Sequence, residues 1–427
     1  MNIPDLYKKY LECEAVSTDT RKILPRCLFV ALKGGNFNGN QFAEQALNSG
    51  AKYALVDEKE FAKDERYLLV EDCLTALQKI ANHHRRQLNI PFIAITGSNG
   101  KTTTKELVSA VLSKKYKTLA TVGNLNNHIG VPLTLLSIKK DIEIAVIEMG
   151  ANHQQEIKML CEIAEPTHGL ITNIGKAHLA GFGGPEGVKK GKGELYDFLY
   201  QNSGTVFVNT RSEILKEIAS KFADPVLYPG ENEFSHTEFI SASPFIKYQD
   251  EAGNEITTQL LGSYNFDNIA TALCVGKFFD VPLEKANDAV SNYNPSNNRS
   301  QIIEKRTNKI ILDAYNANPS SMKVAIENLM SIDAPRKAVV LGDMFELGEE
   351  AVEEHKKVGE LLNASNFDLV ILTGKLMAEA LENIPRAYYF PDQFSLRNWL
   401  TDHEIEGHYI LIKGSRGMGL EVLVDFI

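Results

Sequence analysis

The stretch from residue 92 to residue 107, FIAITGSNGKTTTKEL, decides the fold of this chain. It runs from a short apolar segment through a turn with two glycines into Lys-Thr-Thr-Thr, which opens a helical pattern. A strand, a glycine turn and a helix N-terminus in this order are suited to cradling phosphate. The usual phosphate loop reads G-x-x-x-x-G-K-[ST], but here Gly97 and Gly100 are only two residues apart and Ile95 takes the place of the first glycine. The stretch is a phosphate loop, a shortened variant of one, or a tight structural turn.

The composition bounds the class of protein. With 427 residues, 44% hydrophobic and 23% charged, the chain is typical of a soluble globular protein of about two or three domains. A net charge of −10 argues against a general nucleic-acid binder, which would carry a basic face. We therefore predict no nucleic-acid partner, although an anion site needs only local donors.

The N-terminus and the cysteines indicate where the protein works. The opening residues, MNIPDLYKKYLECEAV, have no apolar core behind a basic start, so we expect no signal peptide. No apolar run approaches the ~20 residues of a membrane helix, so we expect no transmembrane segment. The five cysteines form no C-x-x-C pair and their number is odd, which favours reduced structural thiols. We predict a cytoplasmic protein and take a monomer as the expected state.

The rhythm of apolar runs divides the chain. A helical spacing over 74–88 is broken by Asn89-Ile90-Pro91, because the residue before proline avoids the helical region. Beyond it, short apolar strands at 92–96, 118–122, 144–149, 169–174 and 205–209 alternate with helices, which favours a parallel sheet covered on both faces. The segment 235–262 reads as two antiparallel strands around a Glu-Ala-Gly-Asn turn, with a helix following over about 265–279.

A second break precedes the last third of the chain. The turn-rich segment SNYNPSNNRS (291–300) predicts a linker, and strands restart at 309–315, 337–343, 369–374 and 409–415. We therefore predict an α/β protein of three domains, over 1–88, 89–296 and 297–427. Ligands are expected at the carboxyl ends of the strands in the second and third domains.

The residues of the glycine turn fit a nucleotide. Gly97 and Gly100 let backbone N–H groups approach a ligand closely, and the helix that follows adds the positive end of its dipole. Lys101 can reach the β- and γ-phosphates, and Thr102 or Thr103 offers a hydroxyl to Mg²⁺. As a bare pattern this spacing still allows a structural turn.

Further candidates follow later strands. Glu148 ends an apolar run, where an acid commonly completes Mg²⁺ binding, but a carboxylate there can also simply meet solvent. His178 could ligate metal or lie satisfied in a core. Lys189, Lys190 and Lys192 are typical of a solvated basic face, and near a nucleotide they would neutralise phosphate oxygens.

Several stretches, in this order, together resemble the Mur ligase family: TGSNGKTTTKE (96–106), VGNLNNHIGVPLTLL (122–136), EMGANHQQEI (148–157), NIGKAHLAGFGGPEGVKKGKGE (173–194), LDAYNANPSSM (312–322) and GDMFELGEEAVEEH (342–355). The segment 17–47 also resembles the family's UDP-substrate domain. The family's loop has the short form G-[TS]-N-G-K-[TS], which accounts for Ile95. The resemblance implies a small α/β N-terminal domain for the UDP-sugar end, a central P-loop ATPase domain with a mostly parallel sheet, and a C-terminal Rossmann-like domain that closes over the site.

The resemblance also implies an activity. NLNNHIGVPLTLL, DAYNANP and GDMFELG are most similar to the family member that adds a dipeptide. That member is an ATP-dependent ligase that joins D-alanyl-D-alanine to the terminal carboxylate of UDP-N-acetylmuramoyl-tripeptide through an acyl phosphate. The product is the UDP-N-acetylmuramoyl-pentapeptide of peptidoglycan synthesis, and ATP and two Mg²⁺ ions are the implied cofactors. The alternatives are a related ligase, either a single-amino-acid-adding member or a folylpolyglutamate synthetase, and a nucleotide-binding scaffold that has lost catalysis.

Individual roles follow from the same resemblance. The implied catalytic residues are Lys101, His178 and Lys192, with Lys192 rather than Lys190 carbamylated into an anion that supports metal. The implied metal ligands are Thr102, Glu148 and His178. The implied ATP-binding set is Gly97, Ser98, Asn99, Gly100, Lys101, Thr102, Thr103, Asn268, Arg299 and Asp313, with Asn265 beside Asn268 in its motif. The implied UDP-substrate set is Thr18, Asp19, Arg21, Asn126 and Asn127, while Lys413, Ser415 and Arg416 match a C-terminal signature without a firm role.

Overall fold

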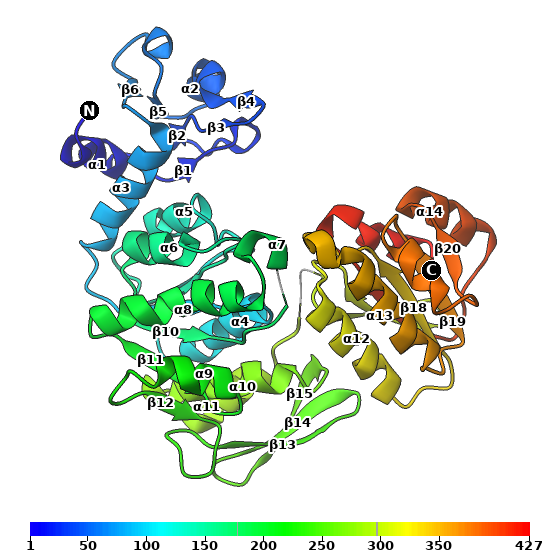
Figure 1. Cartoon of the computed structure of the whole chain (residues 1–427). Coiled ribbons are helices and arrows are strands. Elements are labelled where there is room, and N and C mark those ends of the chain that lie inside the picture. The colour runs from blue at the N-terminus through cyan, green and yellow to red at the C-terminus, as the bar shows by residue number, and fades with distance from the viewer. Residues whose placement is uncertain (177, 296–297) are drawn as a thin grey trace.

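The computed structural model describes residues 1–176, 178–295 and 298–427, and the chain forms three regions, each with its own wholly or mostly parallel sheet (Figure 1). The predicted α/β fold class is confirmed. The domain boundaries 1–88, 89–296 and 297–427 stay predictions, and the junction at 296–297 lies outside the described residues. Among the described helices, none is both long and apolar enough to cross a membrane.

The first region is a small parallel sheet with helices around it. Its strands follow the order β1 (Val16–Ser17), β2 (Leu28–Val30), β5 (Tyr53–Val56) and β6 (Tyr67–Leu69). The remaining elements are α1 (Ile3–Leu11), α2 (Ala43–Asn48), α3 (Cys73–Arg85) and a two-stranded hairpin of β3 (Lys33–Gly34) and β4 (Phe37–Asn38). The helix α3 ends before Pro91, as the sequence predicts, and leads into the central region.

The central region is built on a six-stranded, fully parallel sheet. Its order is β12 (Val226–Tyr228), β11 (Thr205–Asn209), β10 (His168–Ile171), β7 (Phe92–Thr96), β9 (Ile144–Glu148) and β8 (Thr118–Ala120). Alternate residues of each strand enter different cores: Phe92 and Ala94 lie on one face, and Ile93 and Ile95 on the other. This is why the strands read as unbroken apolar runs.

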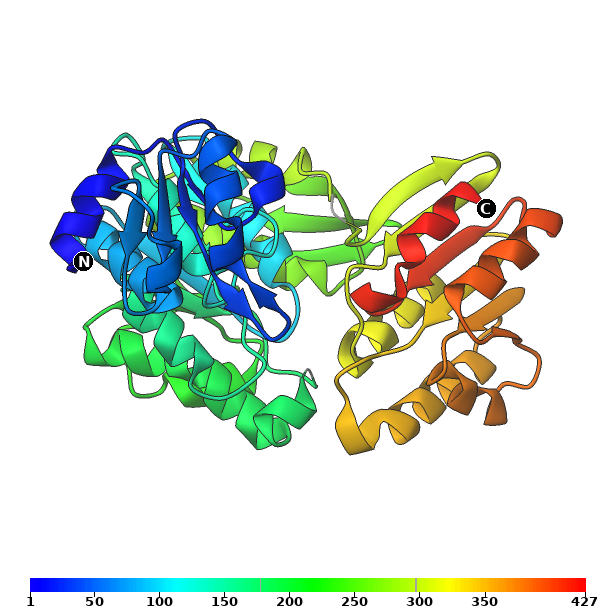
Figure 2. The ribbon, with the colours of Figure 1, turned by 90° about the horizontal axis from the view of Figure 1, so that it is seen from above.

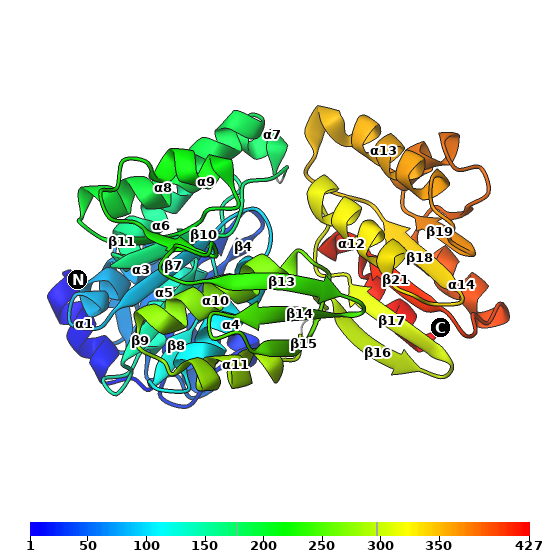
Figure 3. The same cartoon turned by 90° about the horizontal axis from the view of Figure 1, so that it is seen from below.

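Helices cover both faces of this sheet (Figures 1 and 3). The first face packs against α5 (Gly130–Ser137), α6 (Glu156–Ala164) and α8 (Pro185–Gln201), and the second against α4 (Lys101–Leu112), α10 (Asn265–Phe278) and α11 (Leu283–Ser291). The short helices α7 (Leu179–Phe182) and α9 (Glu213–Ala219) complete the region. The first face shares one continuous core with the N-terminal region, and Tyr10 Oη donates across that junction to the Leu136 carbonyl at 2.6 Å.

An antiparallel sheet extends the second face. It contains β13 (Thr237–Ala242), β14 (Phe245–Asp250) and β15 (Glu255–Leu261), and β14 and β15 are the two strands predicted around the Glu-Ala-Gly-Asn turn. The edge strand β13 has no counterpart in the prediction. Three consecutive exposed residues within it obscure the alternation that marks a strand.

The C-terminal region is a six-stranded sheet with one antiparallel edge. The order is β16 (Gln301–Lys305), β17 (Asn308–Asp313), β21 (Tyr409–Lys413), β18 (Lys337–Gly342), β19 (Leu369–Thr373) and β20 (Tyr388–Phe390), and only β16 runs antiparallel. One face packs against α12 (Pro319–Ser331) and α13 (Ala351–Asn363), the other against α14 (Gln393–Asp402) and the 3₁₀ helix η7 (Leu420–Asp425). This region lies beside the other two rather than over them (Figure 2).

The edge strands β16 and β20 are absent from the sequence-based prediction. The residues of β16 are half-buried or exposed, and β20 spans three residues, so neither produces a buried apolar run. The predicted strand 118–122 is also shorter than expected. It ends at Ala120, and Val122 is 74% exposed at the start of a surface loop.

The fold carries a half-buried histidine whose titration should affect stability. The His168 ring, at the start of β10, packs among Phe207, Phe278 and Phe279. Burial lowers the pKa of this imidazole to about 4, whereas an unfolded histidine titrates near pH 6.5. Because the unfolded state takes up the proton first, stability that is fully present above about pH 6.5 is lost as the pH falls toward 4.

We therefore expect wild-type protein to lose about 2 kcal/mol more stability than His168→Gln on acidification from about pH 7.5 to about pH 4.5. Urea unfolding midpoints measured across this range give the comparison, and the difference between variants removes the contribution of carboxylates. His403→Gln, at an exposed position that follows α14, is the matched control and should track wild type. Parallel curves for wild type and His168→Gln would contradict the prediction.

Candidate functional site

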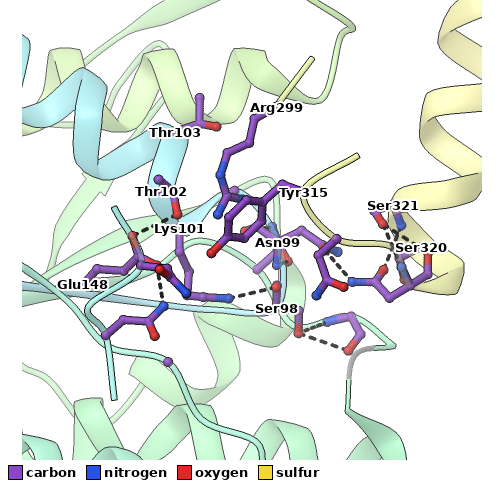
Figure 4. Close-up of a pocket in the computed structure, with 18 of the residues that line it drawn as sticks. Ser98, Asn99, Lys101, Thr102, Thr103, Glu148, Arg299, Tyr315, Ser320 and Ser321 are labelled. Atoms are coloured by element: carbon purple, nitrogen blue, oxygen red, sulfur yellow. Dashed lines mark hydrogen bonds between the residues drawn. The ribbon is translucent and has the colours of Figure 1, made fainter. Parts of the chain in front are cut away.

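A cavity of about 660 Å³ lies where the carboxyl ends of the central strands face the C-terminal region (Figure 4). Most of the predicted site residues line it: Ser98, Asn99, Gly100, Lys101, Thr102, Thr103, Asn126, Asn127, Glu148, His178, Asn265, Asn268, Arg299, Asp313 and Lys413. Gly97, Lys192, Ser415 and Arg416 lie just outside its lining, and Thr18, Asp19 and Arg21 belong to the N-terminal region. Side chains more than 300 positions apart in the sequence thus share one cavity. This agrees with the expectation that ligands bind at the carboxyl ends of the strands.

The backbone of the glycine turn needs its two glycines. Gly97 has φ +143° and Gly100 has φ +78°, a region that side chains rarely adopt. A Cβ on Gly97 would lie 2.0 Å from Thr172 Oγ1, and a Cβ on Gly100 would lie 2.7 Å from Asn268 Oδ1. Gly100 directly precedes α4, so the turn presents the N-terminus of a twelve-residue helix to the cavity.

The loop is clamped to the exit of the neighbouring strand β10. The Ser98 hydroxyl accepts the Gly175 N–H at 2.9 Å and donates to the Gly175 carbonyl at 3.1 Å. Asn173 accepts the Asn99 N–H and donates to the Asn99 carbonyl, both at 3.0 Å. These bonds give Ser98 a structural task that any small hydroxyl residue would meet, and they hold the loop in shape.

The side chain of Lys101 folds back onto the glycine turn. Lys101 Nζ donates to the Gly97 carbonyl at 2.8 Å and to the Ser98 carbonyl at 3.0 Å. Burial lowers the pKa of Lys101 to about 8, the Glu148 carboxylate opposes that shift, and Arg299 adds to it. An ammonium held in this way lies where phosphate oxygens would contact the loop N–H groups.

Glu148 lies at the centre of the site. Its carboxylate is 1% exposed, accepts a hydrogen bond from Thr102 Oγ1 at 2.9 Å and another from Asn126 Nδ2 at 2.7 Å. Lys105 Nζ, from the next turn of α4, lies 3.9 Å from the same carboxylate. A solvated strand-end carboxylate is therefore excluded for Glu148, since this group is buried and paired.

The Thr102 hydroxyl and the Glu148 carboxylate are hard oxygen donors side by side, a pair that suits Mg²⁺. Mg²⁺ keeps several waters and phosphate oxygens in its shell, so two protein ligands are enough. Within the described residues no group of three His, Cys, Asp or Glu side chains is arranged to hold a metal. The donor set therefore fits an ion that arrives with a phosphate rather than one held in a protein cage.

His178 lines the same cavity from the loop after β10. Its Nδ1 pairs with the Glu346 carboxylate of the C-terminal region. Burial lowers the pKa of His178, and the nearby Glu346 charge acts in the opposite direction. A histidine satisfied in a core is thus excluded, because this ring sits at an interface between two regions.

The lysine run on α8 divides between surface and interior. Lys189 pairs with Glu217 at 2.7 Å and Lys190 is exposed, so these two form the solvated face. Lys192 is 1% exposed, donates to the Ala151 carbonyl at 3.0 Å and lies 4.9 Å from the centre of the Phe182 ring. Burial lowers the pKa of Lys192 well below its ordinary value, and the Lys101 charge adds to this.

The C-terminal region contributes a linked set of charges. Lys413 is 1% exposed, and its Nζ contacts Asp313 Oδ2 at 2.5 Å, while Asp313 Oδ1 accepts the Ser300 N–H at 3.2 Å.

In the central region, the buried Asn268 accepts a hydrogen bond from Thr104 Oγ1 at 2.9 Å and donates one to Asn265 at 2.7 Å. Its amide is therefore fixed in orientation beside Gly100.

The predicted UDP-substrate residues are not gathered in one place. Asp19 caps the 3₁₀ helix η1 (Thr20–Lys22) and pairs with Arg21 at 2.8 Å on the surface of the N-terminal region. Asn126 and Asn127 instead line the main cavity, and Asn127 Oδ1 accepts the Gly130 N–H at 2.9 Å where α5 begins. The predicted set is therefore divided between the N-terminal region and the main cavity.

Contacts between the central and C-terminal regions escaped sequence reasoning. Asn318 Nδ2 donates to Asn99 Oδ1 at 2.7 Å, and Lys176 Nζ contacts Glu354 at 2.9 Å. Both Asn318 and Glu354 belong to quoted motifs, but motif spacing does not show what a residue contacts. The burial of Lys192 had a usable signal: Val188, Lys192, Leu195 and Leu199 share one helical face.

The fold and the cavity define a three-domain protein of the phosphate-loop class, with a third domain facing the loop across the site. Family models match most of the chain: the Mur ligase family catalytic domain over residues 12–85, the Mur ligase middle domain over 95–276, and the Mur ligase glutamate ligase domain over 298–416. The chain belongs to the Mur ligase family.

Individual relatives are similar over nearly their whole length. The UDP-N-acetylmuramoyl-tripeptide–D-alanyl-D-alanine ligase of Bacillus subtilis (strain 168) is 35% identical over 421 residues, which cover 96% of this chain and 92% of the relative. The crystal structure I of MurF from Acinetobacter baumannii has a TM-score of 0.86 at 30% identity, covering 99% of this chain and 98% of that one. MurF ligase from Thermotoga maritima in complex with ADP has a TM-score of 0.83 at 26% identity, covering 98% and 97%.

The tight approach of Gly97 to Thr172 predicts a stability change. Gly97→Ala should destabilise the protein by about 2 kcal/mol, because alanine is strained at this φ and its Cβ would meet Thr172 Oγ1. Thr172→Ala removes that oxygen, so the double variant should be less destabilised than the sum of the single variants in urea unfolding. Strictly additive changes in the free energy of unfolding would contradict the predicted clash.

A glycine with room around it provides the control. Gly193 lies within α8, and a Cβ there would meet no heavy atom within 4 Å. Gly193→Ala should leave stability unchanged or raise it by up to about 1 kcal/mol, since alanine is the better helix former.

Proposed function

We propose that this chain is an ATP-dependent ligase that joins D-alanyl-D-alanine to the terminal carboxylate of UDP-N-acetylmuramoyl-tripeptide and so makes the pentapeptide precursor of peptidoglycan. The observation that carries the proposal is the Glu148 carboxylate held between Thr102 of the phosphate loop and Asn126 of the NLNNHIG loop. This arrangement brings a nucleotide-binding loop and a second, substrate-facing loop to one carboxylate. The likeness over 96% of the chain to a ligase named for this reaction supports the same conclusion.

The reaction proceeds in two steps. The tripeptide carboxylate attacks the γ-phosphorus of ATP, and the bond between this phosphorus and the bridging oxygen breaks. ADP departs as the leaving group, and the tripeptide now carries an acyl phosphate. The amine of D-alanyl-D-alanine then attacks the acyl carbon, loses a proton, and expels inorganic phosphate as the peptide bond forms. Two anionic reactants meet in the first step, so the main task of the protein is to neutralise charge.

The residues of the loop supply that neutralisation. Lys101 exchanges its loop carbonyls for phosphate oxygens, and the N–H groups at the start of α4 face the same oxygens. Thr102 and Glu148 would hold one Mg²⁺, and His178 would help to hold a second. When bound, Mg²⁺ would draw charge from the phosphate oxygens and orient them for in-line attack. Arg299 and Asp313 approach from the C-terminal side of the same cavity.

Lys192 is suited to carbamylation. Burial lowers the pKa of the Lys192 amine, which favours its neutral form, and the neutral amine attacks CO₂, forms an N–C bond and loses a proton to give an anionic carbamate. The amine lies 3.0 Å from the carbonyl of Ala151, a residue that lines the cavity. A carbamate there would supply a negative group close to the metal-binding residues, which a lysine ammonium cannot.

Both alternatives have less support. A ligase that adds a single amino acid would share the loop and the acid, but it would not be expected to match the dipeptide-adding relative over 96% of this chain. A scaffold without catalysis would have no use for a buried lysine of lowered pKa or for a buried glutamate paired with the phosphate-loop threonine. The cytoplasmic location and the monomeric state remain proposals, and the cytoplasmic one is supported by five free cysteines.

The substrate requirement tests the function directly. Purified protein should release phosphate from ATP only when Mg²⁺, UDP-N-acetylmuramoyl-tripeptide and D-alanyl-D-alanine are all present, because each step needs its own acceptor. Phosphate release measured with each component omitted in turn gives the answer. Release that requires a single amino acid in place of the dipeptide would support the related ligase, and absence of release in every mixture would support the scaffold.

Substitution of Lys192 tests the carbamate. Lys192→Ala should lower kcat by at least about 100-fold, since one charge-stabilising group contributes on this scale. Short carboxylic acids such as acetate should partly restore activity, because they return a negative group to the space the side chain leaves. Lys190→Ala, at an exposed position two residues away, is the matched control and should behave as wild type. Full activity in Lys192→Ala would remove this lysine from the mechanism.

A further inference from the structure

The short segment that carries Arg299 has an uncommon backbone. Asn298 has φ +58° and Ser300 has φ +49°, so left-handed residues flank the arginine on both sides. Residues other than glycine rarely adopt this conformation, and it persists only where the surroundings hold it in place. The segment enters the C-terminal sheet directly, since β16 begins at Gln301.

Side chains and backbone from two regions hold this segment. The Tyr315 N–H donates to the Asn298 carbonyl at 3.2 Å, and the Ser300 N–H donates to Asp313 Oδ1 at 3.2 Å. Tyr264, at the start of α10 in the central region, places its hydroxyl 2.7 Å from Ser300 Oγ. The backbone on both sides of Arg299 is thus fixed before any ligand binds.

The Arg299 side chain is oriented by a ring. Its guanidinium carbon lies 3.6 Å from the centre of the Tyr315 ring, and the guanidinium carbon of Arg416 lies 5.0 Å from the same centre. Arg299 Nε is buried and has no hydrogen-bond acceptor among the described residues, so hydrogen bonding at Nε does not set its direction. The contact with the Tyr315 ring is a constraint on the direction of the guanidinium.

This stack faces the phosphate loop. Arg299 and Tyr315 line the same cavity as Lys101, Thr102 and Thr103 (Figure 4). The face of the Tyr315 ring, rather than its hydroxyl, makes the contact with the Arg299 guanidinium. An arginine that keeps a planar partner loses little conformational freedom when a phosphate binds.

We propose that Tyr315 is a positioning residue for the nucleotide: its ring holds the Arg299 guanidinium toward the phosphates of ATP. The inference rests on the proposed ATP-dependent activity and adds to it a residue that acts through Arg299. It separates the ring of Tyr315, which is needed, from its hydroxyl, which is not. It also gives the aromatic residue of the DAYNANP motif a role in nucleotide binding.

The test compares Tyr315→Phe, Tyr315→Leu, Arg299→Ala and the double variant Tyr315→Leu/Arg299→Ala. Tyr315→Phe keeps the ring and should match wild type. Tyr315→Leu should raise both the KM for ATP and the Kd of ATP about tenfold, with a smaller change in the KM for D-alanyl-D-alanine, since a cation–π contact of this kind contributes on that scale. The double variant should be no weaker than Arg299→Ala alone, because the ring acts only through the arginine.

Tyr388→Leu is the matched control. Tyr388 is 51% exposed and packs on Trp399 in the C-terminal region, and its removal should leave the KM for ATP unchanged. Thermal unfolding of each variant excludes loss of fold as the cause, and Tyr315→Phe keeps the test valid if Tyr315→Leu does not fold.

The proposal would be overturned by an unchanged Kd of ATP in Tyr315→Leu, by a defect in Tyr315→Phe as large as in Tyr315→Leu, or by defects that multiply in the double variant. The ATP binding measurement needs no turnover, so it separates this inference from the proposed function. Wild type that binds ATP but forms no product would count against the ligase assignment and leave the role of Tyr315 measurable.

Discussion

The site depends on one buried carboxylate. Glu148 is withdrawn from water at the end of β9, so its charge must be met by neighbours, and Thr102, Asn126 and Lys105 meet it from two separate segments. The carboxylate can be satisfied only if α4 starts at Lys101 and the 122–130 loop returns to the same strand end. Leaving a charge buried without partners costs several kcal/mol, so this local requirement fixes the relative position of both loops.

The three regions are joined in physically different ways. The N-terminal region shares a continuous apolar core with the central sheet, and Tyr10 adds a buried hydrogen bond across the junction. The C-terminal region contacts the central one through polar pairs such as Asn99–Asn318 and Lys176–Glu354, and Leu261 of β15 packs into its core. Each such polar contact contributes about 1 kcal/mol net, whereas the stabilisation from a shared apolar core scales with the area that is buried. The C-terminal attachment is therefore the weaker one, and it borders the cavity.

Sequence reasoning recovered what has a strong local signature. The parallel strands appear as unbroken apolar runs because both of their faces are covered, and the loop glycines show because no other residue fits their backbone. The edge strand β16 left no such trace, because its residues are only half-buried or exposed. The contact of Asn99 with Asn318 joins positions 219 residues apart, and only tertiary packing brings them together. Lys192 lay between these cases: its lysine-rich neighbourhood indicated solvent, while its helical alignment with Val188 and Leu195 indicated burial.

The spacing of the glycine turn follows from the same carboxylate. In the parallel pairing of β7 with β9, Ile95 is the register partner of Glu148, and its side chain is buried in the second core. A glycine at position 95 would remove that core contact and weaken the strand at the level where the acid must be held. The strand therefore continues through Thr96, and the turn begins only at Gly97, which leaves two residues before Gly100. The short loop is thus the consequence of a strand that has to extend as far as its neighbour's glutamate.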